Sequence, residues 1–125
     1  MTSQEKFFAK WLTHEFSSGS YPGKDYLDFQ REAQRELRKQ VAAAGFSIRK
    51  FNPNHYEFSA VLQQKNTGKL IYVSISDVRG NTQWWSSVLI RTMKHEKDWT
   101  GGSNHHCMWE DIAATATRLC ELKQV

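Results

Sequence analysis

The chain has 125 residues and a mass of 14.6 kDa, which is the size of a single domain. Hydrophobic residues make up 39% of it and aromatic residues 13%, so the composition excludes a chain that stays disordered. Lys and Arg number 17 against 13 Asp and Glu, which gives a formal net charge of +4. This moderate excess permits an anionic partner but does not prove one.

Two other classes are excluded at this stage. No apolar run approaches the ~20 residues of a transmembrane helix, and residues 1–16 lack the apolar core and cleavage site of a signal peptide. Two cysteines, Cys107 and Cys120, are too few for a disulfide framework, and their separation does not fit a zinc-ligand pair. We therefore expect a cytoplasmic protein with free thiols, no metal and no cofactor.

The first predicted element is a helix near the N-terminus. Thr2 and Glu5 have the spacing of a capping box, and Phe7, Phe8 and Trp11 then share one helical face. Residues 17–23 break this helix with small polar residues, Pro and Gly. We treat residues 1–125 as one domain, in which 18–25 is linker-like. One interpretation of 1–17 is an appendage that docks on the body or on a partner.

The second helix is the strongest prediction. It begins near Asp25 and ends at Gly45. A predicted buried stripe runs along it, made of Tyr26, Phe29, Ala33, Leu37, Val41 and Ala44. Three arginines lie on nearly the opposite side, with acidic residues three or four positions away: Arg31, Arg35 and Arg38. Two interpretations remain open, a solvated ion-paired face and a row of guanidinium groups that grips a phosphate backbone or another partner.

The centre of the chain has the alternation of β-strands. We predict strands over 46–51, 56–62, 71–76 and 85–93, with a hairpin turn at 66–68 and a second turn at 80–81. A last helix follows from about Met108 to Lys123. Short connections favour antiparallel neighbours. The sequence thus predicts an α+β fold, in which helices pack on an antiparallel meander of about four strands in the order α-α-β-β-β-β-α.

The basic excess is concentrated in one part of the chain. Residues 65–97 hold six basic and two acidic residues, whereas residues 1–64 give +2 and residues 98–125 give −2. Glycines before a helix can turn backbone N–H groups toward an anion, and a Trp can stack on a base. We therefore predict a nucleic-acid contact formed by Arg79, Arg91, Lys94, His95, Lys97, Trp99, Gly101, Gly102 and Asn104. The alternative is a solvated loop whose glycines serve only to turn the chain.

An adjacent pair of tryptophans, Trp84 and Trp85, has two interpretations of its own. The pair either packs in the core and at the sheet edge or forms an exposed aromatic hot spot for a partner. Trp11 extends the same patch in the second interpretation. The candidate partner-binding residues are Trp11, Trp84, Trp85, Arg31, Arg35 and Arg38.

Catalysis has one candidate residue and no signature. His95 beside Lys94, Lys97 and Asp98 is a possible general acid and base for phosphodiester cleavage, which would make the protein a small metal-independent nuclease. The run His105, His106 and Cys107 is poorly spaced for a metal, because adjacent residues rarely ligate one ion. We expect a binding protein rather than an enzyme.

Two segments carry a resemblance. Ser74–Arg79 (SISDVR) and Leu89–Asn104 (LIRTMKHEKDWTGGSN) resemble a family of small proteins that phages and other mobile elements carry. No activity is assigned to that family, so no functional residue is transferred from it. Its class is similar to that of anti-CRISPR and other anti-defence proteins, which implies a nucleic-acid or nucleoprotein partner, such as a CRISPR effector, and inhibition by occlusion. A pure protein-interaction domain is the further alternative.

The order of elements from Tyr26 onward is also similar to that of double-stranded RNA-binding domains. In those domains basic residues at the start of the last helix contact phosphates. Here residues 101–106 read GGSNHH, and no lysine run follows. The sequence therefore departs from that pattern at the position that contacts the duplex.

Overall fold

The computed structural model describes residues 2–11, 24–52, 58–75, 84–95 and 104–121, without the side chains of Ser3, Trp84 and residues 24–26. The described helices and strands confirm the predicted α+β class. They are α1 (Ser3–Trp11), α2 (Lys24–Ala43), β1 (Phe46–Asn52), β2 (Phe58–Gln64), β3 (Leu70–Ile75), η1 (Trp84–Ser86), β4 (Val88–Met93), β5 (Asn104–Cys107), η2 (Trp109–Asp111) and α3 (Ile112–Glu121), where η1 and η2 are 3-10 turns.

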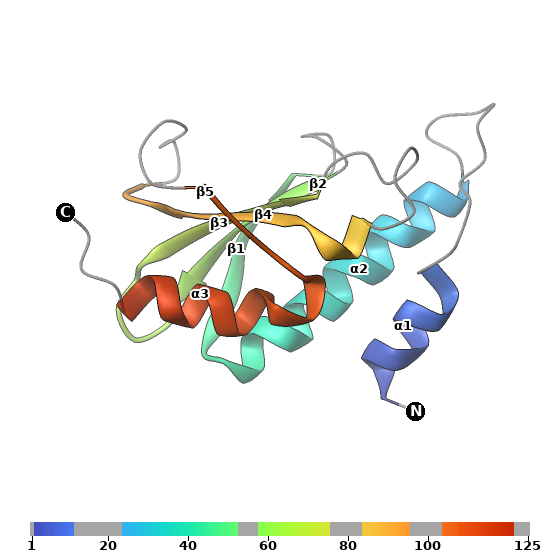
Figure 1. Ribbon diagram of the computed structural model, residues 1–125, viewed down its shortest axis with the longest axis horizontal. Helices are drawn as coiled ribbons and strands as arrows, with labels where there is room; N and C mark the ends of the chain where they lie inside the picture. The colour runs from blue at the N-terminus through green and yellow to red at the C-terminus, as the bar shows by residue number, and fades with distance from the viewer. Residues whose placement is uncertain (1, 12–23, 53–57, 76–83, 96–103, 122–125) are drawn as a thin grey trace.

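The described strands form one antiparallel meander in the order β1-β2-β3-β4-β5. Figure 1 shows α1, α2 and α3 together on one side of this sheet. The sheet has one strand more than the predicted four, because β5 precedes the last helix. None of the described helices has the length and apolarity needed to cross a lipid bilayer.

The N-terminal helix begins as its sequence predicts. The Glu5 backbone N–H donates to Thr2 Oγ1 over 3.1 Å, and Thr2 Oγ1 donates to Glu5 Oε1 over 3.2 Å. The capping box therefore satisfies a free N–H in the first turn. Phe7 and Trp11 are 4% and 2% exposed and belong to the same core as α2, the sheet and α3. The described part of the first helix is thus packed on the body.

The second helix buries most of its predicted stripe. Phe29, Ala33, Leu37 and Val41 are fully buried, whereas Ala44 is exposed. Ala44 lies just beyond the end of the helix at Ala43. Gly45 follows with a φ of 85°, a conformation that side chains with a Cβ rarely adopt, and its carbonyl accepts the Lys65 N–H over 2.9 Å. This bond ties the end of α2 to the turn between β2 and β3.

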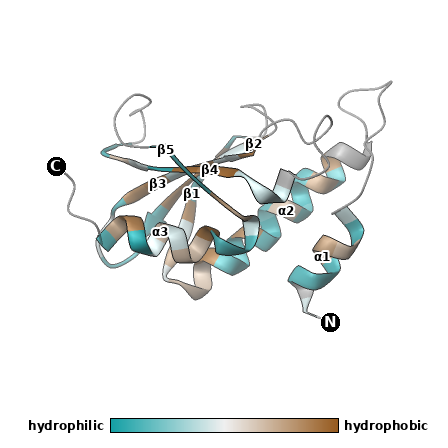
Figure 2. Ribbon diagram, in the orientation of Figure 1, coloured by the Kyte–Doolittle hydropathy of each residue, from teal (hydrophilic) through white to brown (hydrophobic). Residues whose placement is uncertain are grey.

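The edge strand β5 was not predicted, and its composition explains why. Its four residues read NHHC, which lack the β-branched and apolar residues that mark a strand. Figure 2 colours most of β5 as hydrophilic. Pairing with β4 alone makes it a strand, since Val88, Leu89, Ile90 and Arg91 oppose its residues one by one.

Candidate nucleic-acid interface

The two faces of the sheet carry different residues. One face joins the helices in the main core, to which β2, β3 and β4 contribute alternate residues such as Leu62, Val73 and Ile90. The other face, which we call the outer face, has a separate small cluster of Val61, Tyr72 and Met93, against which Leu70 and Leu89 pack. Strand alternation therefore directs every second side chain away from the helices.

One row of direct cross-strand partners crosses the outer face from β1 to β5. Lys50 pairs with Val61, Val61 with Tyr72, Tyr72 with Arg91, and Arg91 with Asn104. With strands about 4.8 Å apart, the row spans about 19 Å. Because partners in register share a face, these five residues form one continuous strip, with a cation at one edge and a second cation near the other.

A β-bulge places Lys50 in this strip. The register of β1 against β2 shifts between Ile48 and Lys50, which leaves Arg49 as the extra residue. Without the shift Lys50 would share a face with Ile48, which packs on the core. The bulge reverses this alternation, so Phe51 packs on the core and Lys50 faces outward. Arg49 also reaches this face, since it donates to Gln63 Oε1 over 3.2 Å.

Arg91 lies on β4, next to the edge strand, and is held in place by an aromatic ring. Its guanidinium carbon is 5.1 Å from the centroid of the Tyr72 ring, within the range of a cation–π interaction. Arg91 is 8% exposed and Tyr72 is 3% exposed. Arg91 therefore supplies positive charge from beneath the surface, and direct contact with a large ligand is left to the exposed residues around it.

A second row lies beside the first and is polar at both ends. Asn52 pairs with Ser59, Ser59 with Ser74, Ser74 with Leu89, and Leu89 with His106. Asn52 donates to Ser59 Oγ over 3.4 Å, which confirms that both side chains lie on the same face. His106 is exposed at the β5 edge. Hydroxyl, amide and imidazole groups thus flank the cations of the first row.

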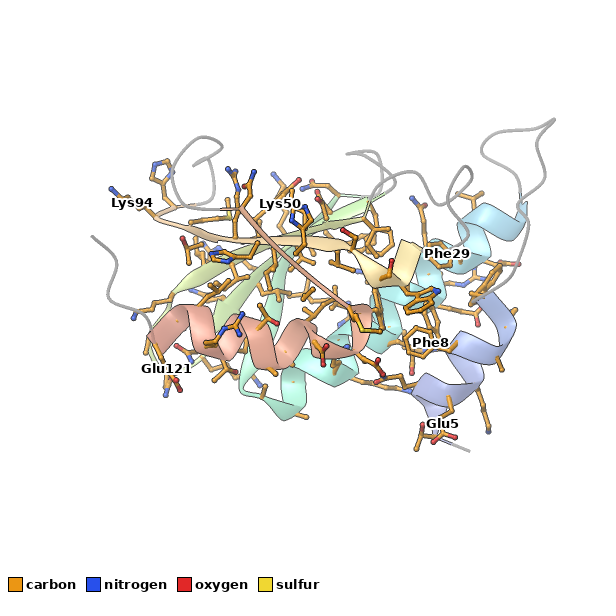
Figure 3. The ribbon with its side chains drawn as sticks, viewed as in Figure 1. Glu5, Phe8, Phe29, Lys50, Lys94 and Glu121 are labelled. Atoms are coloured by element: carbon orange, nitrogen blue, oxygen red, sulfur yellow. The ribbon has the colours of Figure 1, made fainter. Side chains whose placement is uncertain are left out.

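The charge of the sheet has one sign. The strands and their described turns (46–52, 58–75, 88–95 and 104–107) contain no Asp or Glu and six basic residues: Arg49, Lys50, Lys65, Lys69, Arg91 and Lys94. Lys69 turns toward the helices, where it donates to the Cys120 carbonyl near the end of α3 over 2.6 Å. Figure 3 shows Lys50 and Lys94 on the side of the sheet away from the helices, and Glu5 and Glu121 on the helical side. We call Arg49, Lys50, Arg91, Lys94, Asn104 and His106 the basic sheet face.

The structure brings together part of the predicted nucleic-acid contact. Arg91 and Asn104 are direct cross-strand partners, and Lys94 and His95 are exposed where β4 ends. The remaining predicted residues lie outside the described part of the chain: Arg79, Lys97, Trp99, Gly101 and Gly102. The prediction missed Arg49, Lys50 and, as an anion-binding residue, His106. The sequence carried no such signal, because the predicted strand over 56–62 includes Glu57 and Lys50 reaches this face only through a register shift.

The predicted partner-binding aromatic residues are less exposed than the arginines. Trp11 packs edge-on against Phe29 with ring centroids 5.5 Å apart, so contact with a partner through Trp11 would require α1 to leave α2. Trp85 is half-buried against the core, and the side chain of Trp84 lies outside the described residues. Core packing therefore accounts for the described rings.

The arginine row on α2 is exposed but only partly ion-paired. Arg31 pairs with Asp28, whereas Glu32 pairs with Lys10 of α1 over 2.8 Å. Arg35 and Arg38 are exposed and form no ion pair within the described part of the chain. The predicted ion-paired face thus holds for the first arginine and not for the other two. The row lies on a different layer of the molecule from the basic sheet face.

A pocket of about 620 Å³ lies where β5 meets α3, and its lining includes His106, Cys107, Asp111, Thr115 and Arg118. Burial raises the pKa of the Cys107 thiol, which outweighs the opposing effect of the Thr115 hydrogen bond. Cys107 and His106 are neighbours on a strand and face opposite sides, so they do not form a nucleophile–base pair. Within the described residues, no group of three or more His, Cys, Asp or Glu is placed to hold a metal ion.

No protein family, curated protein or solved structure matches the chain. Only the geometry and charge of the chain itself bear on its function.

Proposed function

We propose that this protein binds single-stranded nucleic acid on the basic sheet face. The observation that carries the proposal is the outward strip from Lys50 to Asn104, set in a sheet whose described strands contain no carboxylate. Proteins that bind single strands without sequence preference use a positively charged surface that follows the phosphate backbone. A sheet face of one charge is such a surface.

A single strand suits this protein better than a duplex. Double-stranded RNA-binding domains, which have a similar order of elements, contact the duplex through basic residues at the start of the last helix. Here Glu110 and Asp111 are exposed just before α3 and would repel phosphates at that position. The cations lie instead on the opposite side of the sheet, on which a flexible strand can lie across several β-strands.

In this proposal the exposed cations Arg49, Lys50 and Lys94 contact phosphates, and Arg91 adds positive potential from beneath. Asn104 and His106 contribute polar contacts at the β5 edge. The protein then acts by occlusion and needs no cofactor. The resemblance to mobile-element proteins leads us to propose that the occluded strand belongs to a host defence complex.

The test measures affinity and its salt dependence. Fluorescence anisotropy with labelled oligo(U) and oligo(dT) is recorded between about 50 and 200 mM NaCl. With three cations that contact phosphates, the slope of log affinity against log salt should be about −2 for a single strand. The two oligonucleotides also show whether RNA or DNA is preferred.

Charge reversal locates the site. Lys50→Glu should weaken binding by about tenfold and make the salt slope shallower. Lys6→Glu is the matched control, because Lys6 is exposed on α1 and the net charge changes equally. Equal losses in the two variants, or binding independent of salt, would overturn the proposal. Degradation of the oligonucleotide that disappears in His95→Ala would instead establish the nuclease alternative.

A further inference from the structure

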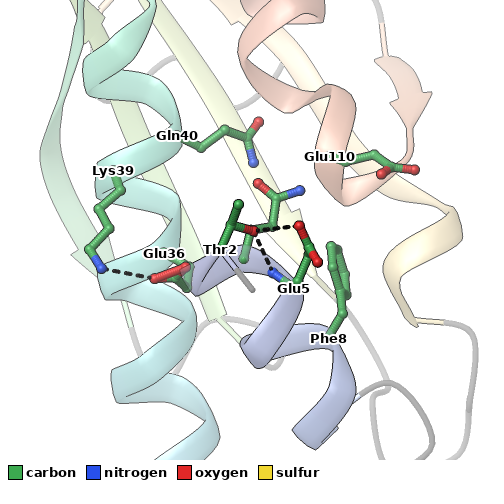
Figure 4. Close-up of a pocket in the computed structure, with 8 residues that line it drawn as sticks. Thr2, Glu5, Phe8, Glu36, Lys39, Gln40 and Glu110 are labelled. Carbon is green, nitrogen blue, oxygen red and sulfur yellow. Dashed lines mark hydrogen bonds and ion pairs between the residues drawn. The ribbon is translucent and has the colours of Figure 1, made fainter.

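A pocket of about 510 Å³ lies on the helical side, away from the basic sheet face, between α1, α2 and η2. Figure 4 shows the lining residues on these three elements. Its volume is in the range of small-ligand sites. The pocket lining consists of Thr2, Gln4, Glu5, Phe8, Glu36, Lys39, Gln40 and Glu110.

The lining is acidic. Three carboxylates come from three different elements, Glu5 from α1, Glu36 from α2 and Glu110 from η2, and the single cation of this described lining is Lys39. The formal charge of the lining is −2. Such an arrangement favours a positively charged ligand.

Glu36 is the unusual member of this group. Its side chain is 5% exposed, and its Oε2 atom is buried without accepting a hydrogen bond in the described part of the chain. The Lys39 ammonium is 3.4 Å away, at ion-pair distance, but most of the Lys39 side chain is exposed. Buried carboxylates are normally hydrogen-bonded, so this acceptor is left with capacity for a donor from outside the chain.

Two other polar side chains of the lining already have hydrogen-bond partners. Gln40 donates from Nε2 to the Trp109 carbonyl over 3.0 Å and accepts the Ala113 N–H at Oε1 over 2.9 Å. Thr2 Oγ1 is bound to Glu5. Phe8 adds an apolar aromatic wall. The lining therefore offers carboxylates for a charged head and a ring for an apolar stem.

We infer that this pocket binds an organic cation, namely an alkylammonium or guanidinium group on an apolar stem. The head donates to the Glu36 carboxylate, in a lining that Glu5 and Glu110 make more acidic, and the stem packs on Phe8. A bare metal ion is a poorer fit, because no described group of three carboxylate, His or Cys side chains is placed to ligate one. This inference does not depend on the proposed function.

The test uses spermidine and agmatine as ammonium and guanidinium probes, added to protein freed of nucleic acid. The ¹⁵N-labelled protein is titrated at constant ionic strength, and the backbone amide of Glu36 and the side-chain amide of Gln40 are followed. We expect saturable shifts at these positions. The absence of saturable shifts with either probe would overturn the inference.

Three variants test whether spermidine binds at the carboxylates of this pocket. Glu36→Gln should weaken spermidine binding by about tenfold, since the amide oxygen still accepts a hydrogen bond but the negative charge that strengthens it is lost. Glu110→Gln removes an exposed carboxylate and should weaken binding without affecting the fold. Glu121→Gln, at the far end of α3, is the matched control and should bind as the wild type does. Equal losses in the three variants would show that spermidine responds only to net charge, and equal affinities in all four proteins would show that these carboxylates do not bind it; either result would overturn the inference.

Discussion

Cys107 shows how one residue takes its chemistry from its neighbours. Its thiol lies under α3, where burial raises its pKa and Asp111 raises it further, while the Thr115 hydrogen bond and Arg118 lower it. Burial is the largest of these effects, so the protonated thiol is favoured. Because the folded-state pKa is above the unfolded-state value, the stability contributed by the thiol is present at lower pH and is lost as the pH rises through the folded-state pKa.

Because burial raises its pKa, we expect the Cys107 thiol to react slowly with a disulfide reagent at neutral pH. In a Cys120→Ala background, the rate at which Cys107 reacts with a disulfide reagent should rise with pH through a midpoint above that of a cysteine in a short peptide. Thr115→Val should move the midpoint higher still, because Thr115 stabilises the thiolate. Stopped-flow absorbance across about pH 7 to 11 measures the midpoint for each protein. A midpoint below the peptide value would contradict this account.

At the scale of elements, a single amide joins α2 to the start of α3. Gln40 accepts the Ala113 N–H, one of the first-turn donors that a helix leaves without an internal partner, and donates to the Trp109 carbonyl. A side chain from α2 thus caps the start of α3. The residue before the 3-10 turn that leads into α3, Met108, makes no side-chain capping bond.

Gln40→Leu should therefore lower the free energy of unfolding by about 2–3 kcal/mol, because two hydrogen bonds are lost and buried polar groups are left without partners. Gln34→Leu is the control, since Gln34 is on the same helix and makes no side-chain hydrogen bond within the described residues. Urea denaturation followed by circular dichroism gives both values. Similar losses in the two variants would mean that the helix surface, not the bridge, is responsible.

The sequence predicted those elements whose periodicity is set by burial. Four residues of the predicted α2 stripe (Phe29, Ala33, Leu37 and Val41) are buried, and β2 and β3 alternate as predicted, because core residues recur at the helical and strand periods. Ala44 is exposed, and the side chain of Tyr26 lies outside the described residues. It could not predict β5 or the bulge at Arg49, since both depend on pairing with residues distant in the chain. The strand predicted over 85–93 begins only at Val88, because Trp84–Ser86 forms a 3-10 turn.

At the scale of the whole molecule, charge is divided between layers. The helices and the 3-10 turn before α3 hold all the acidic residues of the described part of the chain, and the strands hold none. The sequence located a basic excess in residues 65–97, but the sheet adds Arg49 and Lys50 from outside that window by placing them beside β2. The topology, which the order of charges along the chain does not reveal, thus completes the candidate site.

The place of α1 in the molecule can be tested through Trp11. This ring is 2% exposed in the same core as Phe29 and Trp109, so Trp11→Ala should lower the free energy of unfolding by about 3–5 kcal/mol. Because the core is shared, circular dichroism and tryptophan fluorescence should still report one coincident transition in urea. Leu27→Ala, at a residue 49% exposed, should change stability by less than about 0.5 kcal/mol. If Trp11→Ala has as little effect as Leu27→Ala, or if a separate early transition appears, then α1 is an appendage and the sheet with α2 and α3 folds without it.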